Sequence, residues 1–333
     1  MPALLPIALK ALPAPTPVKA LPAPPHDKQM GPYTLRPVPD GKAYLITEKR
    51  LKPLDLTRLE LGKVGNVGQK PCLLANNEKV TGICVHNATV DALLIAPDCT
   101  AYYIPSGVDL EEHVATHSAL LAALCGGGRL LPFPDGMLLL FTATGYCRRI
   151  TLEMLPHKEG DSVALWPGAE APKLAGIFSA KEGRSLLLLL NSGYALHVDV
   201  ADTLHAEKER ERRFKAITLR KGERVVEVLP YDADNPGTIV VTEYGWAVRR
   251  ESKINAHNWK SRGVRFLCKG AQDTCAYACK PADGLLLARS DGSVLCVRTE
   301  ELSTAKGASH GKATMRATKG EKVVGVLPLQ ISD

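Results

Sequence analysis

The stretch Leu138-Leu-Leu-Phe-Thr-Ala-Thr-Gly145-Tyr-Cys-Arg-Arg149 decides the fold, because versions of it return along the chain. Each version has an apolar run, a small turn that ends in glycine and a second run. The clearest further copies start at Leu187, Ile239 and Leu285. Their turn glycines and Gly145 are spaced 48, 52 and 47 residues apart. A fixed period near 50 is typical of a radial or linear array of small β-units.

The rest of each unit recurs as well. Arg220-Lys-Gly-Glu-Arg-Val-Val-Glu-Val-Leu-Pro230 returns 98 residues later, two periods on, as Thr318-Lys-Gly-Glu-Lys-Val-Val-Gly-Val-Leu-Pro328. Two degenerate copies of the repeat, without the turn glycine, start at Ala43 and Ala92. We expect their closing halves at 72–85 and 120–133. Six units therefore fill residues 40–330, with blades at about 40–89, 90–134, 135–182, 183–234, 235–280 and 281–330.

The runs inside each unit have the composition of β-strands. They are four to six residues long, rich in Leu, Val and Ile, and bounded by Gly, Asn, Asp and Pro. Each unit therefore reads as a four-stranded antiparallel sheet, with residues 138–141 and 186–190 in the core. One such sheet exposes its apolar faces, so neighbouring units must stack, and closing the ring removes the end faces. The sequence predicts an all-β, six-bladed, propeller-like ring.

A proline-rich segment precedes the ring at residues 1–39. Lys10-Ala-Leu-Pro-Ala-Pro15 repeats as Lys19-Ala-Leu-Pro-Ala-Pro24, and proline at this density favours an extended spacer or a disordered arm. A ligand for a proline-binding module is the alternative. We expect removal of residues 1–39 to leave the melting of the ring unchanged. The start of the chain does not resemble a secretory signal, and no apolar run has the length of a membrane span, so we expect a soluble cytoplasmic protein.

Neither a metal site nor a catalytic site is predicted, and no cofactor is expected. The nine cysteines lack paired Cys-x-x-Cys spacing and mostly fall in or beside predicted strands, as reduced, buried thiols do. Cys275 and Cys279 are four residues apart, but no histidine follows at ligand spacing. The nine histidines are dispersed, and no phosphate-binding loop or serine triad is visible.

Positive charge is concentrated in the last two and a half units. Residues 1–204 hold 19 Lys and Arg against 19 Asp and Glu, whereas residues 205–333 hold 23 against 16. Equivalent loops of a ring project along one rim, so basic loops at each position make a curved positive track that suits a bent polyanion. The alternative is solvated loop charge, and the alternation of Glu with Lys and Arg at 207–213 fits a compensated helix surface. We predict phosphate contacts from Arg148, Arg149, Arg212, Arg213, Arg249, Arg250, Lys253, Lys260, Arg262, Arg265, Lys306, Lys312 and Arg316.

The last two units resemble adjacent blades of the C-terminal domain of the DNA gyrase A subunit and of its paralogue, the topoisomerase IV A subunit. In that family a blade runs from an apolar strand through a Gly turn to a Lys/Arg-rich strand, then to Arg-Gly or Lys-Gly before a Val/Ile strand. A Gly-Glu turn and a Val-Val-Gly strand end the blade. The matching elements here are residues 238–242, Gly245, Arg249-Arg250, Arg262-Gly263-Val264, Gly311, Gly320-Glu321 and Val323-Val-Gly325.

The resemblance implies a six-bladed β-pinwheel that binds duplex DNA around its rim and bends it. In the family, this presents DNA to the strand-passing core of a type IIA topoisomerase, which comprises the A-subunit N-terminal region and an ATPase subunit. The Gln-Arg-Arg-Gly-Gly-Lys-Gly box of gyrase has no counterpart, because Gly62-Lys-Val-Gly-Asn-Val-Gly-Gln-Lys70 stands there. A topoisomerase IV-like role is therefore the better expectation, with the protein associated with the nucleoid.

By itself the ring is expected neither to cleave DNA nor to hydrolyse ATP. The alternative function is a protein-interaction platform with little DNA binding. In that case the neutral blades one to three would be the docking face, and the proline-rich arm would be a tether.

Overall fold

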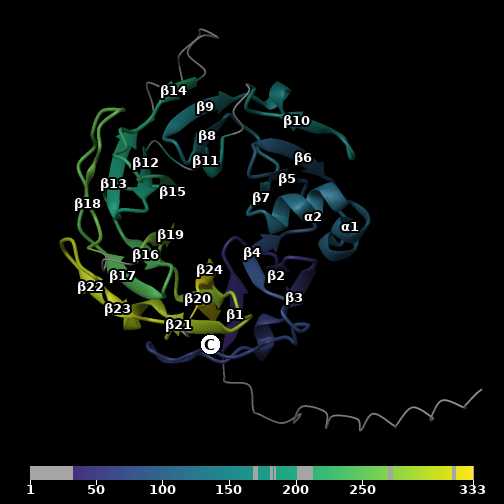
Figure 1. Cartoon of the computed structure of the whole chain (residues 1–333), viewed down its shortest axis with the longest axis horizontal. Coiled ribbons are helices and arrows are strands. Elements are labelled where there is room, and N and C mark those ends of the chain that lie inside the picture. Colours follow the sequence, from purple (N-terminus) through teal and green to yellow (C-terminus); the bar gives the residue numbers. More distant parts are fainter. Residues whose placement is uncertain are drawn as a thin grey trace, which may run out of the picture.

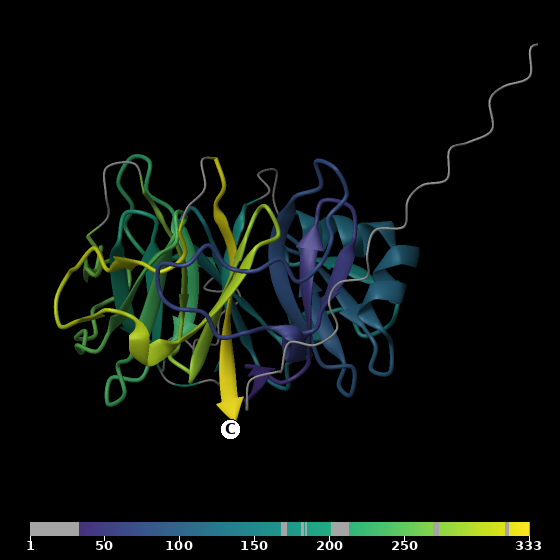
Figure 2. The same cartoon turned by 90° about the horizontal axis from the view of Figure 1, so that it is seen from below.

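The computed structural model describes residues 33–167, 172–180, 183, 185–200, 213–268, 273–316 and 320–332. Six small sheets stand around a common axis and form a ring (Figure 1), and the side view shows a short cylinder (Figure 2). The predicted propeller-like ring of six units is therefore confirmed. Within the described ranges, no helix is both long enough and apolar enough to cross a membrane.

Every repeat folds back on itself in the same way. Its first two strands form a hairpin, and its last strand returns to pair antiparallel with the first strand on the other side. The last strands line the inside of the ring. In repeats one to three the strands are β2 (Lys42–Thr47), β3 (Leu51–Leu54) and β4 (Val80–His86), then β5 (Ala92–Ile95), β6 (Thr100–Ile104) and β7 (Arg129–Pro132), then β8 (Leu138–Thr142), β9 (Tyr146–Ile150) and β11 (Leu174–Ser179). In repeats four to six they are β12 (Ser185–Leu190), β13 (Tyr194–Asp199) and β15 (Val225–Pro230), then β16 (Thr238–Thr242), β17 (Trp246–Arg250) and β19 (Cys275–Cys279), then β20 (Gly284–Arg289), β21 (Val294–Arg298) and β24 (Val323–Ser332).

The turn glycines adopt the backbone conformation that the repeat predicts. Gly145, Gly193, Gly245 and Gly292 have φ angles of 82°, 83°, 81° and 80°. At Gly193 a Cβ atom would lie 2.4 Å from the carbonyl oxygen of Leu267, so both the angle and the space require glycine.

The segment between the second and last strands of each repeat leaves its own sheet, and we call this segment the excursion. In the third to sixth repeats, its short strands pair with the second strand of the preceding repeat. They are β10 (Ser162–Ala164) on β6, β14 (Arg213–Lys215) on β9, β18 (Val264–Arg265) on β13, and β22 (Thr304–Ala305) and β23 (Lys312–Ala313) on β17. Four of the six sheets have the predicted four strands, but none of these four is built by one repeat alone. Neighbouring repeats are thus tied together by backbone hydrogen bonds as well as by packing.

The first and sixth repeats are joined by two separate sets of backbone contacts, which close the ring. The excursion of the first repeat reaches the sixth, where Leu61 and Gln69 form bridges to Cys296 and Val294 on β21. In addition, β1 (Thr34–Pro37) pairs antiparallel with β24 along its whole length. We had assigned residues 34–37 to the arm, and the structure corrects this, because Leu35 is only 4% exposed in the core between the first and last repeats. Residues 1–32 of the predicted arm lie outside the described residues.

The second repeat carries two helices where strands were expected. Helix α1 (Leu110–Thr116) begins at Asp109, whose side chain accepts hydrogen bonds from the backbone N–H groups of Glu111 and Glu112. Helix α2 (Ser118–Cys125) follows at once, so only β7 remains of the closing half predicted at 120–133. Both helices lie on the outer side of the ring, where α1 packs against β3 and takes the place of an exchanged strand. The fold is therefore mostly β rather than all-β.

The core lies between successive sheets. Phe141 and Leu139 of the third repeat pack with Leu186 and Leu188 of the fourth, and all four side chains are fully buried. The predicted core runs at 138–141 and 186–190 are thereby confirmed. Within the described residues, short 3-10 turns follow the second strand at η1 (Leu56–Arg58), η2 (Leu152–Met154) and η5 (Thr299–Glu301).

Candidate nucleic-acid interface

The outer side of the ring carries the exchanged strands β10, β14, β18, β22 and β23 (Figure 1), so the charges of the excursions shape the electrostatics of the rim. The excursions of repeats four, five and six, residues 200–224, 251–274 and 299–322, hold eight, five and five Lys and Arg against five, two and three Asp and Glu. The excursion of the first repeat, 55–79, holds four against three. By contrast, 105–128 holds none against three, and 151–173 holds two against four.

The order of the excursions around the ring makes one side of the rim basic. Because the first repeat's excursion lies on the sixth repeat, the four excursions with excess positive charge are contiguous. We call these four the basic arc, and the excursions of repeats two and three the acidic arc. We had grouped blades one to three as one neutral half. The structure instead places the outer segment of the first repeat at the end of the basic arc.

Several predicted cations project from the basic arc. Lys253 is exposed, although its Nζ lies 3.9 Å from an oxygen of Asp234. The guanidinium of Arg213 lies 5.7 Å from the ring centre of Trp166. The exposed set comprises Arg213, Lys253, Lys260, Arg265, Lys306, Lys312 and Arg316. Lys63 and Lys70 of the first repeat are exposed as well and were not predicted.

Two arginines of the basic arc contact the aromatic ring of Tyr194. The guanidinium of Arg262 lies 3.8 Å from the centre of its ring, and that of Arg265 lies 5.6 Å from it. Hydrogen bonds from Arg265 and Arg262 lower the pKa of the Tyr194 hydroxyl. Arg262 also donates to Glu223 at 2.7 Å, so this arginine links its excursion to the fourth repeat. Burial alone would raise the pKa of Glu223, but the hydrogen bond from Arg262 holds it below its usual value.

Aromatic side chains recur next to the turn glycine in three successive repeats. These are Tyr146, Tyr194 and Trp246, each the first residue of a second strand, and Tyr146 and Trp246 are 43% and 41% exposed. The register places Lys215 opposite Tyr146 and Arg265 opposite Tyr194. We did not predict this set, although the residue after each turn glycine signals it in the sequence.

Four of the predicted arginines are engaged inside the protein. Arg250 is 8% exposed, donates to the carbonyl of Phe266 at 2.7 Å, and lies 4.6 Å from the centre of that ring. Burial lowers the pKa of Arg250. Arg149 is 6% exposed, Arg249 forms an ion pair with Glu251 at 2.8 Å, and Arg148 donates to the carbonyl of Leu165.

These contacts correct part of the predicted site. The side chains of Arg149 and Arg250 cannot reach a phosphate outside the ring, and we leave both out of the interface. Arg148 and Arg249 are half-buried and are engaged by Leu165 and Glu251. Arg212 lies outside the described residues.

Comparisons with known proteins bear on the fold. No family model and no curated protein matches the chain. The solved C-terminal domain of DNA gyrase A matches with a TM-score of 0.69 at 18% identity, over 86% of this chain and 98% of that domain. The C-terminal domain of DNA topoisomerase IV matches with a TM-score of 0.59 at 14% identity, over 86% of this chain and 92% of that domain. The chain therefore has the ring fold of the C-terminal domains of DNA gyrase A and DNA topoisomerase IV.

Proposed function

We propose that this chain binds duplex DNA along the basic arc and bends it around the rim. The observation that carries the proposal is the contiguity of four excursions with excess positive charge, from different repeats, on the outer side of the ring. Exposed Lys and Arg on such a surface suit phosphate oxygens, and contacts of this kind position DNA without reading its sequence. The likeness of fold to two DNA topoisomerase domains supports the same function.

Bending follows from the shape of the arc. The excursions lie at successive positions around a ring, so a straight duplex can touch only one or two of them (Figure 1). A duplex that contacts all four must curve with the rim. Smooth bending of a site of 20–30 base pairs costs about 1–6 kcal/mol, which additional phosphate contacts can offset.

In this proposal the ring serves a separate type IIA topoisomerase core, made of an A-subunit N-terminal region and an ATPase subunit. This proposal assigns catalysis to that core, and the protein would lie on the nucleoid in the cytoplasm. A topoisomerase IV-like role is favoured over gyrase-like wrapping, because residues 62–70 lack the basic gyrase box. This stretch instead belongs to the segment that closes the ring onto β21.

Ligase-catalysed circularisation tests the proposed bending. We expect the purified chain to increase the yield of circles from a linear duplex shorter than about 150 base pairs, because such a duplex is too stiff to close readily by itself. Binding without any gain in circles would contradict bending, while leaving DNA binding in place.

The acidic arc favours a second, compatible function as a protein-docking face. It carries α1 and α2, and the excursion of the second repeat has three carboxylates and no Lys or Arg. A protein docked there would leave the basic arc free for DNA. If the chain bound no duplex even at low salt, this platform function would replace the first proposal.

A further inference from the structure

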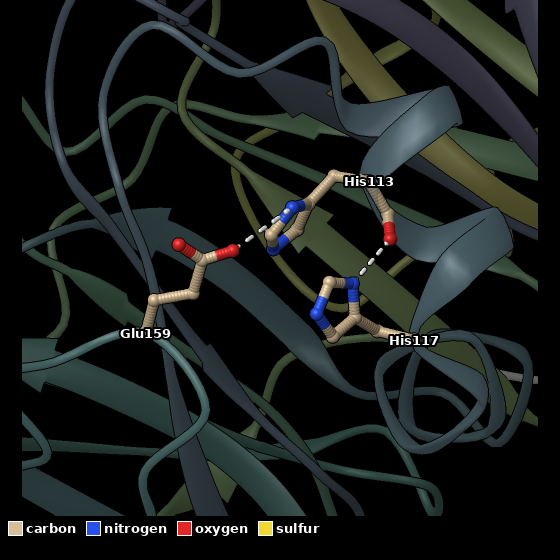
Figure 3. Close-up of side chains that lie close together, drawn as sticks. All are labelled: His113, His117 and Glu159. Atoms are coloured by element: carbon tan, nitrogen blue, oxygen red, sulfur yellow. Dashed lines mark hydrogen bonds and ion pairs between the residues drawn. The ribbon is translucent and has the colours of Figure 1, made fainter.

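We propose that the chain binds a divalent transition metal, best Zn²⁺, between His113, His117 and Glu159. Figure 3 shows the three side chains close together on the acidic arc, where the junction of α1 and α2 meets the excursion of the third repeat. One donor atom from each residue lies within 4.8 Å of the other two. Within the described parts of the chain, these residues form the one cluster of His, Cys, Asp and Glu with such spacing.

The helix sets the positions of the two imidazoles. His113 lies in α1 and His117 caps its C-terminus, so the two residues are four apart and their rings lie on one side, with centres 4.4 Å apart. The same i, i+4 spacing places two zinc-binding histidines on one helix face in metalloproteases. The sequence contains this His-x-x-x-His signal, but we had treated the histidines as dispersed.

Hydrogen bonding leaves His117 with a donor atom for a metal. Its Nδ1 lies 2.7 Å from the carbonyl oxygen of His113 (Figure 3). A carbonyl only accepts, so Nδ1 carries the proton and Nε2 keeps a free lone pair. Zinc-bound histidines commonly donate their second ring N–H to a carbonyl or carboxylate in this way.

The contact between His113 and Glu159 has the spacing of two ligands rather than of a hydrogen bond. Nδ1 of His113 lies 3.7 Å from an oxygen of Glu159, which is too long for a hydrogen bond. Two donors at zinc–ligand distances of 2.0–2.1 Å on a tetrahedral ion lie about 3.4 Å apart. The His113 side chain is 7% exposed and held in place, whereas that of Glu159 is 54% exposed and free to adjust.

The donor set identifies the class of metal. Two imidazole nitrogens and one carboxylate oxygen suit Zn²⁺, and the same trio occurs in zinc sites that keep a fourth position open. A cavity of about 340 Å³ adjoins the cluster and is lined by His113, His117 and Asp161 among others. Water in this cavity would complete the tetrahedron.

The bound metal would fasten two excursions that share no strand pairing. His113 and His117 belong to the second repeat and Glu159 to the third. Elsewhere on the rim the excursions are held by strand exchange, whereas here helices replace the exchanged strand. The inference stands apart from DNA binding, because the site lies on the acidic arc.

Titration of the chelator-treated full chain with zinc chloride, followed by calorimetry, tests the site. We expect one equivalent per chain and a rise in melting temperature with zinc. The variant His117→Ala should weaken binding more than a hundredfold, since even lost outer-shell partners cost about 10–100-fold. Glu159→Gln, at an exposed position, should weaken it at least tenfold, and His310→Ala, at an exposed histidine of the sixth repeat, should leave it unchanged.

Co²⁺ as a spectroscopic probe separates this site from the nine free thiols. Nitrogen and oxygen ligands should give visible d–d bands without the near-ultraviolet charge-transfer band of a thiolate. A thiolate band, equal zinc binding by His117→Ala and the parent, or no binding by the parent would each overturn the proposal.

Discussion

Replacing Lys260, Lys306 and Lys312 together by glutamine should lower the affinity for duplex DNA on the order of a thousandfold at about 50 mM salt. All three side chains are exposed on the basic arc. Each lost phosphate contact removes about 0.9 from the slope of log affinity against log salt, which amounts to about tenfold at this salt concentration. The loss should be the same for unrelated DNA sequences, because backbone contacts carry no sequence information. Electrophoretic or fluorescence titration of a labelled duplex measures it.

A matched control variant has the same change in net charge, but its substitutions lie outside the basic arc. Lys49, Lys158 and Lys173 are exposed in the first and third repeats and lie outside the four excursions of the basic arc. Replacing these three by glutamine should change affinity only slightly. Equal losses in the two triple variants would mean that overall charge, and not the arc, attracts DNA.

Deleting residues 1–37 should destabilise the ring by about 3 kcal/mol and lower its melting temperature by several degrees. The deletion removes β1 from β24, the buried side chain of Leu35 and the Tyr33 hydroxyl, which accepts a hydrogen bond from the backbone of Leu61 at 2.7 Å. Burial of one leucine contributes about 1.5–3 kcal/mol and a hydrogen bond about 1 kcal/mol. Thermal unfolding followed by circular dichroism measures the change.

A chain that begins at Tyr33 is the control for this deletion. It keeps β1 and should have the same melting temperature as the full chain. If deletion of residues 1–37 left the melting temperature unchanged, closure through β1 would not contribute to stability, and the expectation drawn from composition alone would stand.

The repeat in the sequence predicted the ring because its signals are local. Turn glycines at Gly145, Gly193, Gly245 and Gly292 and the apolar runs before them recur at nearly constant spacing, and each run is buried. Such runs have few alternatives, since fully buried strands of this length must be covered on both faces. Six repeats that stack and close are the physical consequence.

Strand exchange could not be predicted, because the exchanged strands are short and their partners are far away in the sequence. The strands β18 and β22 contain two residues each, and their partners lie in the preceding repeat. The run Ser118–Cys125 suits a buried helix or strand equally well, and no side-chain cap at its N-terminus marks it as a helix. Leu35 is one apolar residue among prolines, so pairing of β1 was not visible either.

Charge in the sequence indicated the arc but not the direction of individual side chains. Trp246 and Arg250 lie on one strand, yet Trp246 is exposed while Phe266 of the excursion covers Arg250. The exposed lysines follow from loop position alone, whereas buried arginines depend on which excursion lies over them. Glu159 likewise joins His113 only through folding, because 46 residues separate them in the sequence.

Duplex affinity as a function of salt tests the central proposal most directly. If six exposed cations of the basic arc contact phosphates, log affinity should fall with log salt at a slope of about −5, a loss of roughly a thousandfold between 50 and 200 mM. That steep loss, with binding to a long linear duplex at the low-salt end, is the result we expect. A flat salt dependence, or no binding at 50 mM, would contradict DNA binding by the basic arc.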